Sequence, residues 1–172
     1  MEEMKTVRLE ELVEGSSLFQ SKGVSTIKVT RDGVKEAIEI PIRSSGIAEL
    51  VDAFSKETPT PPSINVLVKP DDEIGQELKL VKKQWVQILD VTDKAYREEL
   101  DKHNSDLGMK IVLKGIDVVF KDDNGTVVDD DDRKVEILKG QGITGEQFSQ
   151  IVEDISNLTK WEEDREDAFL EQ

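Results

Sequence analysis

An aspartate-rich segment with the sequence FKDDNGTVVDDDDRKVEI holds the residues that most resemble a metal site. Carboxylate and amide oxygens are the ligands that Ca²⁺ prefers in proteins. An EF-hand loop aligned on Gly125 places Asp122 and Asn124 at ligand positions. It also places Phe120 at the first ligand position, where a side-chain oxygen is required. The ligand set is therefore incomplete, and we predict that the segment is not a calcium-binding loop.

A turn between two strands explains the same segment better. IDVVF precedes the aspartates and KVEIL follows them, and both runs are rich in the β-branched residues typical of strands. The Asn124-Gly125 pair readily adopts the positive φ that tight turns require. We expect a hairpin turn at residues 122–125, followed by a loose acidic connection at residues 129–132. Weak and unspecific binding of divalent ions by this connection stays open as an alternative.

Side chains suited to catalysis or to cofactor binding are scarce in the sequence. There are no cysteines, and His103 is the single histidine, so neither a Cys/His zinc site nor a Ser–His–acid triad finds a supported set of residues. GQGITG, at residues 140–145, has the glycine spacing of a dinucleotide loop but lacks the surrounding βαβ unit. Thr144 and Gln147 fit a helix capping box instead. We predict a protein that is not an enzyme, with no catalytic residues, no cofactor and no metal.

The chain is strongly acidic, and the acidity is concentrated near its C-terminus. Its 172 residues include 38 Asp and Glu against 23 Lys and Arg, which gives a net charge of −15. Such a chain repels nucleic-acid phosphates and favours basic surfaces on protein partners. The absence of cysteine, of an apolar signal sequence and of any long apolar run favours a cytoplasmic location without membrane binding. We expect protein partners, with homo-oligomer formation left open.

Apolar periodicity predicts a mixed fold in the N-terminal half. Alternating apolar residues on both sides of Asp32-Gly33 predict a β-hairpin with a type I′ turn. Helical spacing in SSGIAELVDAFS predicts a helix that begins with Ser44 or Ser45 as its cap. The proline-rich connector at residues 57–63 is either a linker or a rigid crossover within the domain. SINVLVKP and WVQILDV read as strands that follow it.

The C-terminal half is predicted to be largely helical. TDKAYREELDKHNSDLGMKIVL reads as a helix with Thr92 as its N-cap, and a second helix begins at the Thr144 capping box. TKWEEDREDAFLEQ reads as a final acidic helix. The predicted fold class is α+β, with antiparallel hairpins, packed amphipathic helices and an acidic helical C-terminus. We expect residues 1–140 to form the mixed domain and residues 141–172 the acidic segment.

Apolar residues in the C-terminal segment are the candidates for partner binding. They recur at helical spacing or stand alone in an acidic context, which is typical of helices that bury one face against another surface. Packing in the protein's own core is the competing explanation for each of them. The candidates are Phe148, Ile151, Ile155, Trp161 and Phe169.

The sequence from DKAYREELDKHNSDLGMKIVLKGIDV through LTKWEEDREDAFLE resembles the phage or prophage tail assembly chaperones. The resemblance covers the C-terminal half and lies in size, acidity and a charged helical end with a tryptophan. It implies a non-catalytic chaperone or adaptor that coats the tape measure protein and recruits tail tube subunits. Two alternatives stay open: a virion structural protein, such as a tail tube or terminator subunit, and an acidic inhibitor that mimics DNA.

Overall fold

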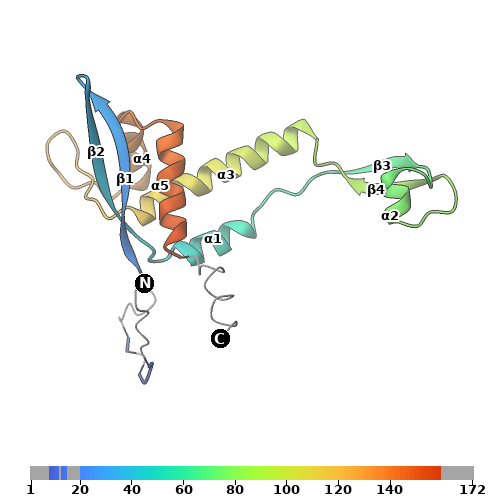
Figure 1. Cartoon of the computed structure of the whole chain (residues 1–172), viewed down its shortest axis with the longest axis horizontal. Coiled ribbons are helices and arrows are strands. Elements are labelled where there is room, and N and C mark those ends of the chain that lie inside the picture. The colour runs from blue at the N-terminus through green and yellow to red at the C-terminus, as the bar shows by residue number, and fades with distance from the viewer. Residues whose placement is uncertain (1–7, 12, 15–19, 160–172) are drawn as a thin grey trace.

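The computed structural model describes residues 8–11, 13–14 and 20–159 of the chain, and its fold is α+β, as predicted. Figure 1 shows a body with a smaller unit that projects from the N-terminal end of α3. We call this smaller unit, residues 63–89, the tip. The described elements are β1 (Lys22–Arg31), β2 (Val34–Arg43), α1 (Ile47–Ser55), β3 (Ser63–Val68), α2 (Glu73–Glu77), β4 (Gln84–Leu89), α3 (Lys94–Gly115), α4 (Asp131–Gly140) and α5 (Gly145–Asn157).

The predicted hairpin is confirmed as the antiparallel pair of β1 and β2. Asp32 and Gly33 have φ values of 50° and 80°, the positive values that a type I′ turn requires. The register places Ile27 opposite Ile38, so both side chains lie on the same face of the pair. The residues that alternate with them are exposed, and this face is buried or half-buried along most of its length, at Ser25, Ile27, Val29, Ile38, Ile40 and Ile42. The hairpin therefore presents one apolar face to the helices of the body.

One hydrophobic core joins the hairpin to the helices of the body. Its buried side chains are Ile27, Ile42, Ile47, Ile111, Val112, Ile116, Leu138, Ile151 and Ile155. Helices α3 and α5 approach closely where Gly115 meets Ile155. A Cβ atom on Gly115 would lie 2.6 Å from two carbon atoms of the Ile155 side chain. Because α5 shares this core with β1 and β2, the core extends across the predicted division at residue 140.

Helix α5 begins as the sequence predicts. The Thr144 hydroxyl oxygen accepts a hydrogen bond from the backbone N–H of Gln147, and the Gln147 side chain accepts one from the backbone N–H of Thr144. This reciprocal pair satisfies backbone donors that have no partner within the helix. Ile143 and Phe148, on either side of the cap, are half-buried against the core. The predicted acidic helix after it lies, from residue 160 onward, outside the described residues.

Two predicted helix caps are wrong. The N-cap of α1 is Gly46, which has a left-handed φ of 71° and no side chain to form a capping hydrogen bond. The Ser44 hydroxyl instead accepts a hydrogen bond from the backbone N–H of Ser21. The N-cap of α3 is Asp93, whose carboxylate accepts a hydrogen bond from the backbone N–H of Tyr96. The Thr92 hydroxyl donates to Asp90 instead. In both cases another hydrogen bond engages the side chain that the sequence pattern assigns to the cap.

Candidate protein-binding site

The first part of the aspartate segment forms the predicted turn. Asp122 accepts the backbone N–H groups of Asn124 and Thr126 at 2.9 Å each, and Gly125 has a φ of 79°. The flanking residues pair only at a single bridge, between Lys121 and Val127, rather than as two full strands. The Asp122 carboxylate therefore stabilises the turn through hydrogen bonds to the backbone.

The second part of the aspartate segment is not a loose connection but the start of helix α4. Asp130 is the N-cap and accepts the backbone N–H of Arg133 at 3.0 Å. Asp131 and Asp132 lie in the first turn, where the helix dipole favours negative charge, and Lys139 lies in the last turn. KVEIL is consequently helical, and its prediction as a strand is wrong. Three of the four aspartates at residues 129–132, Asp130, Asp131 and Asp132, are therefore explained by the initiation of a helix.

Replacing Asp130 with alanine tests the assignment of Asp130 as an N-cap. We expect the free energy of unfolding to fall by about 0.5–2 kcal/mol, because the N–H of Arg133 loses its acceptor. Chemical denaturation measures the change. Asp129→Ala is the matched control, since Asp129 precedes the cap and we expect a smaller effect. Equal losses from the two variants would contradict a specific capping role for Asp130.

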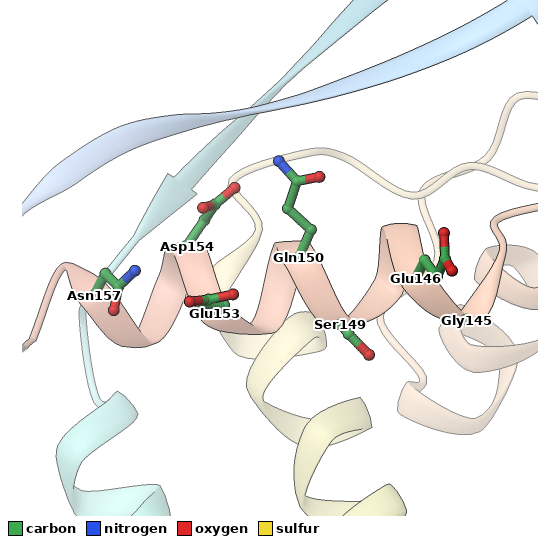
Figure 2. Close-up of a pocket in the computed structure, with 7 residues that line it drawn as sticks. All are labelled: Gly145, Glu146, Ser149, Gln150, Glu153, Asp154 and Asn157. Carbon is green, nitrogen blue, oxygen red and sulfur yellow. The ribbon is translucent and has the colours of Figure 1, made fainter.

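His103 packs against an aromatic ring in the body, and Asp154 of α5 forms a hydrogen bond to the hairpin. The His103 ring lies 5.0 Å from the Phe54 ring, centroid to centroid. Figure 2 shows Gln150 and Asp154 pointing from α5 toward the hairpin, while Ser149 points away from it. The Asp154 carboxylate accepts the hydroxyl of the buried Ser25 at 2.6 Å, which ties α5 to β1. Among the described residues, no three acidic or histidine side chains are grouped to hold a metal ion.

The predicted partner-binding residues fall into three groups. Ile151 and Ile155 are 1% and 0% exposed, so they belong to the core and are not available to a partner at the surface of this structure. Phe148 is half-buried against the same core. Trp161 and Phe169 lie outside the described residues. Phe148, Ile151 and Ile155 form one apolar stripe along α5, and a helical stripe alone does not distinguish a core face from a binding face.

The tip contains a second antiparallel hairpin in which the two faces differ. Strands β3 and β4 pair with Val66 opposite Val86 and with Leu67 opposite Trp85. Because side chains alternate across a strand, Val66, Val68 and Val86 share one face. This face is buried or half-buried at these three residues, with Val68 only 2% exposed. Figure 1 shows the short helix α2 beside the two strands.

The other face of the tip exposes large apolar side chains to solvent. Leu67 and Trp85 lie directly opposite each other across the two strands, and Leu89 lies on the same face. Trp85 is 69% exposed and Leu89 is 60% exposed. Val81, in the segment that leads into β4, is 96% exposed. An exposed face that carries a tryptophan and leucines is typical of protein-binding surfaces.

The segment that joins β3 to β4 carries four acidic residues, Asp71, Asp72, Glu73 and Glu77, and also four exposed lysines. None of these lysines forms a salt bridge within the part of the chain that the structure describes. They are Lys69, Lys79, Lys82 and Lys83. The tip is therefore close to neutral on a chain with a net charge of −15, and its lysines can meet acidic residues of a partner.

Hydrogen bonds close the base of the tip, where the chain enters and leaves the second hairpin. The proline-rich connector leads from α1 to β3, and the carbonyl of Pro62 accepts the backbone N–H of Asp90 at 2.8 Å. The hydroxyl and the backbone N–H of Thr92 both donate to the Asp90 carboxylate. These bonds lower the pKa of Asp90 below its ordinary value, with the hydroxyl as the larger cause. The carboxylate form therefore links the end of β4 to the start of α3.

No family model, no curated protein and no solved structure matches the chain. In the described part of the chain, no helix is both long enough and apolar enough to cross a membrane. The tip is therefore a candidate binding site on its own geometry alone. The sequence signal for it was the run WVQILDV, rich in aromatic and β-branched residues, which predicts a strand but does not reveal which of its faces is covered.

Proposed function

We propose that the protein is a non-catalytic assembly chaperone or adaptor of a phage-type tail, and that the tip holds its partner proteins. The observation that carries the binding role is the exposed apolar face formed by Leu67, Trp85 and Leu89 on a projecting unit. The resemblance of the C-terminal half to tail assembly chaperones supplies the partners, which are the tape measure protein and the tail tube subunit.

The proposed mechanism is transient shielding of apolar segments on these partners. A two-stranded surface with one exposed tryptophan buries a small area, and such surfaces favour reversible binding. The exposed lysines Lys82 and Lys83, which directly precede β4, add attraction to acidic residues, and this attraction weakens as salt screens exposed charges. The net charge of −15 on the chain opposes aggregation of the loaded complex. The partner is thus covered during assembly and released when a more extensive contact becomes available.

Co-expression with the tape measure protein and the tail tube protein encoded in the same genome tests the proposal. We expect the chain to raise the soluble fraction of the tape measure protein and to purify with it as a defined complex. Complex formation should weaken with rising salt because the lysine contacts are exposed. A chain that purifies with neither protein, and that leaves the solubility of both unchanged, would overturn the proposed function.

A further inference from the structure

The hairpin of the body has two edges with different hydrogen-bonding states. Arg31 and Val34 flank a two-residue turn, so they form a hydrogen-bonded pair, and every second residue from there directs its backbone groups toward the partner strand. The intervening residues direct theirs outward. On β2 these outward residues include Lys35, Ala37 and Glu39. Each of the three offers one N–H and one C=O along the outer edge of the strand.

The outer edge of β1 is covered by helix α5. The side-chain amide of Gln147 donates to the carbonyl of Lys28, and that of Gln150 donates to the carbonyl of Thr26, both at 3.3 Å. Both carbonyls point away from β2 and toward α5. This direction agrees with the assignment of Lys28 and Thr26 as residues whose backbone groups point outward. The edge is therefore protected from pairing with another strand.

The outer edge of β2 is open over residues 35–39. Within the described part of the chain, its backbone groups have no hydrogen-bond partner on the side away from β1. The open stretch ends at Pro41, which has no N–H and whose carbonyl accepts the N–H of Asp117 at 2.8 Å. A further strand could therefore pair only between the hairpin turn and Pro41.

We propose that this open edge pairs with the same edge of a second copy of the chain, antiparallel and centred on Ala37. In this register Lys35 lies opposite Glu39 of the second copy, and Glu39 lies opposite Lys35 of the second copy. Three hydrogen-bonded pairs form about six backbone hydrogen bonds, two for each pair. Charged residues on an edge strand usually discourage pairing, but here the two opposite charges are self-complementary.

The limits of the open edge fit this register. When Lys35 lies opposite Glu39, Val34 of one copy lies opposite Ile40 of the other, and the turn of the second copy reaches Pro41. The pairing therefore ends where Asp117 already occupies the edge. Two hairpins joined in this way form one four-stranded antiparallel sheet, in which the edges of both β2 strands are satisfied.

An apolar groove beside β2 provides the second observation. It has a volume of about 670 Å³, and Ile38, Ile40, Phe120 and Ile143 are among the residues that line it. This volume lies within the range of about 300–1,000 Å³ that is typical of binding pockets. Val34, which is 60% exposed, lies on the same face of β2 as Ile38 and Ile40. In the dimer Val34 of the second copy adds an apolar side chain beside this groove.

Exchanging the charges of Lys35 and Glu39 tests the register directly. Sedimentation equilibrium of the full chain measures the Kd of the dimer. We expect the wild type to dimerise with a Kd in the micromolar range. Lys35→Glu and Glu39→Lys should each raise the Kd about ten-fold, because like charges then face each other at both ends of the pairing. The double variant with both substitutions should return to within about three-fold of the wild-type Kd.

The controls separate edge pairing from a general effect of charge. Lys28→Glu makes the same charge change on β1 and should leave the Kd unchanged. The chain has no native cysteine, so Ala37→Cys should form a disulfide-linked dimer on oxidation, whereas Lys28→Cys should not. A monomeric wild type, or a double variant as weak as the single variants, would overturn the proposal. Equal cross-linking of the two cysteine variants would overturn it as well.

Discussion

Replacing Ile155 with alanine is expected to lower the free energy of unfolding by about 2–5 kcal/mol. Ile155 is fully buried, and its side chain packs against the backbone of α3 at Gly115, which has no side chain of its own to fill the space left behind. Helices α3 and α5 already approach closely there, so the site cannot collapse completely around the smaller residue. Urea denaturation followed by circular dichroism measures the loss.

The expected loss from Ile155→Ala is a large fraction of the total stability, since small domains are only about 5–15 kcal/mol more stable than their unfolded chains. Val24→Ala is the control, since Val24 is 54% exposed on the outer face of β1, and we expect a change near 0.5 kcal/mol or below. If Ile155→Ala lost no more than the control, α5 would not be part of the core. The C-terminal segment would then be a separate unit, as the sequence division at residue 140 predicts.

The second large effect is expected at the tip, where Trp85→Thr combined with Leu89→Thr should weaken binding of the tape measure protein about 100-fold. Tryptophans at the centre of a binding surface contribute about 2 kcal/mol or more, and Leu89 adds apolar area on the same face. Threonine keeps the β propensity of the strand, so the tip should stay folded. Isothermal titration calorimetry against the purified partner measures the change in Kd.

The control for the tip variant is Val24→Thr. It removes an exposed apolar side chain from a strand of the body while it keeps the β-branched shape, so we expect the Kd for the tape measure protein to stay at the wild-type value. Circular dichroism should show the same helix and strand content for both variants. Binding by the double variant within about three-fold of wild type would show that the tip does not hold the partner.

Features that depend on local backbone chemistry could be predicted from the sequence. Asp32-Gly33 specifies a type I′ turn because both residues tolerate positive φ, and the alternation around it then fixes which residues face the core. Thr144 and Gln147 specify the start of α5 because each satisfies a backbone donor of the other. These signals lie within a few residues of one another, so no distant contact has to be known.

The helix at residues 131–140 was missed because two local signals compete there. Val135 and Ile137 favour a strand by composition, whereas Asp130 favours a helix by capping, and a short apolar run does not distinguish the two. The interaction of the first-turn aspartates with the helix dipole adds to the capping effect. A search for an N-cap aspartate followed by further acidic residues would have identified this start.

The exposed apolar face of the tip could not be predicted from the sequence because burial depends on distant contacts. Ile155 and Trp85 are both apolar residues in amphipathic elements, yet the first is 0% exposed and the second 69%. The difference arises because α5 packs against β1 and α3, while the outer face of β4 receives no covering element among the described residues. Periodicity gives the apolar face of an element but not the surface that covers it.

The fluorescence of Trp85 tests most directly whether the tip is the partner-binding site. The chain has two tryptophans, so Trp161→Phe leaves Trp85 as the single reporter, and 69% of its side chain is exposed before binding. We predict that saturating tape measure protein, in a version without tryptophan, shifts its emission to shorter wavelength as the ring leaves water. A complex that forms without any change in Trp85 emission would contradict the central claim.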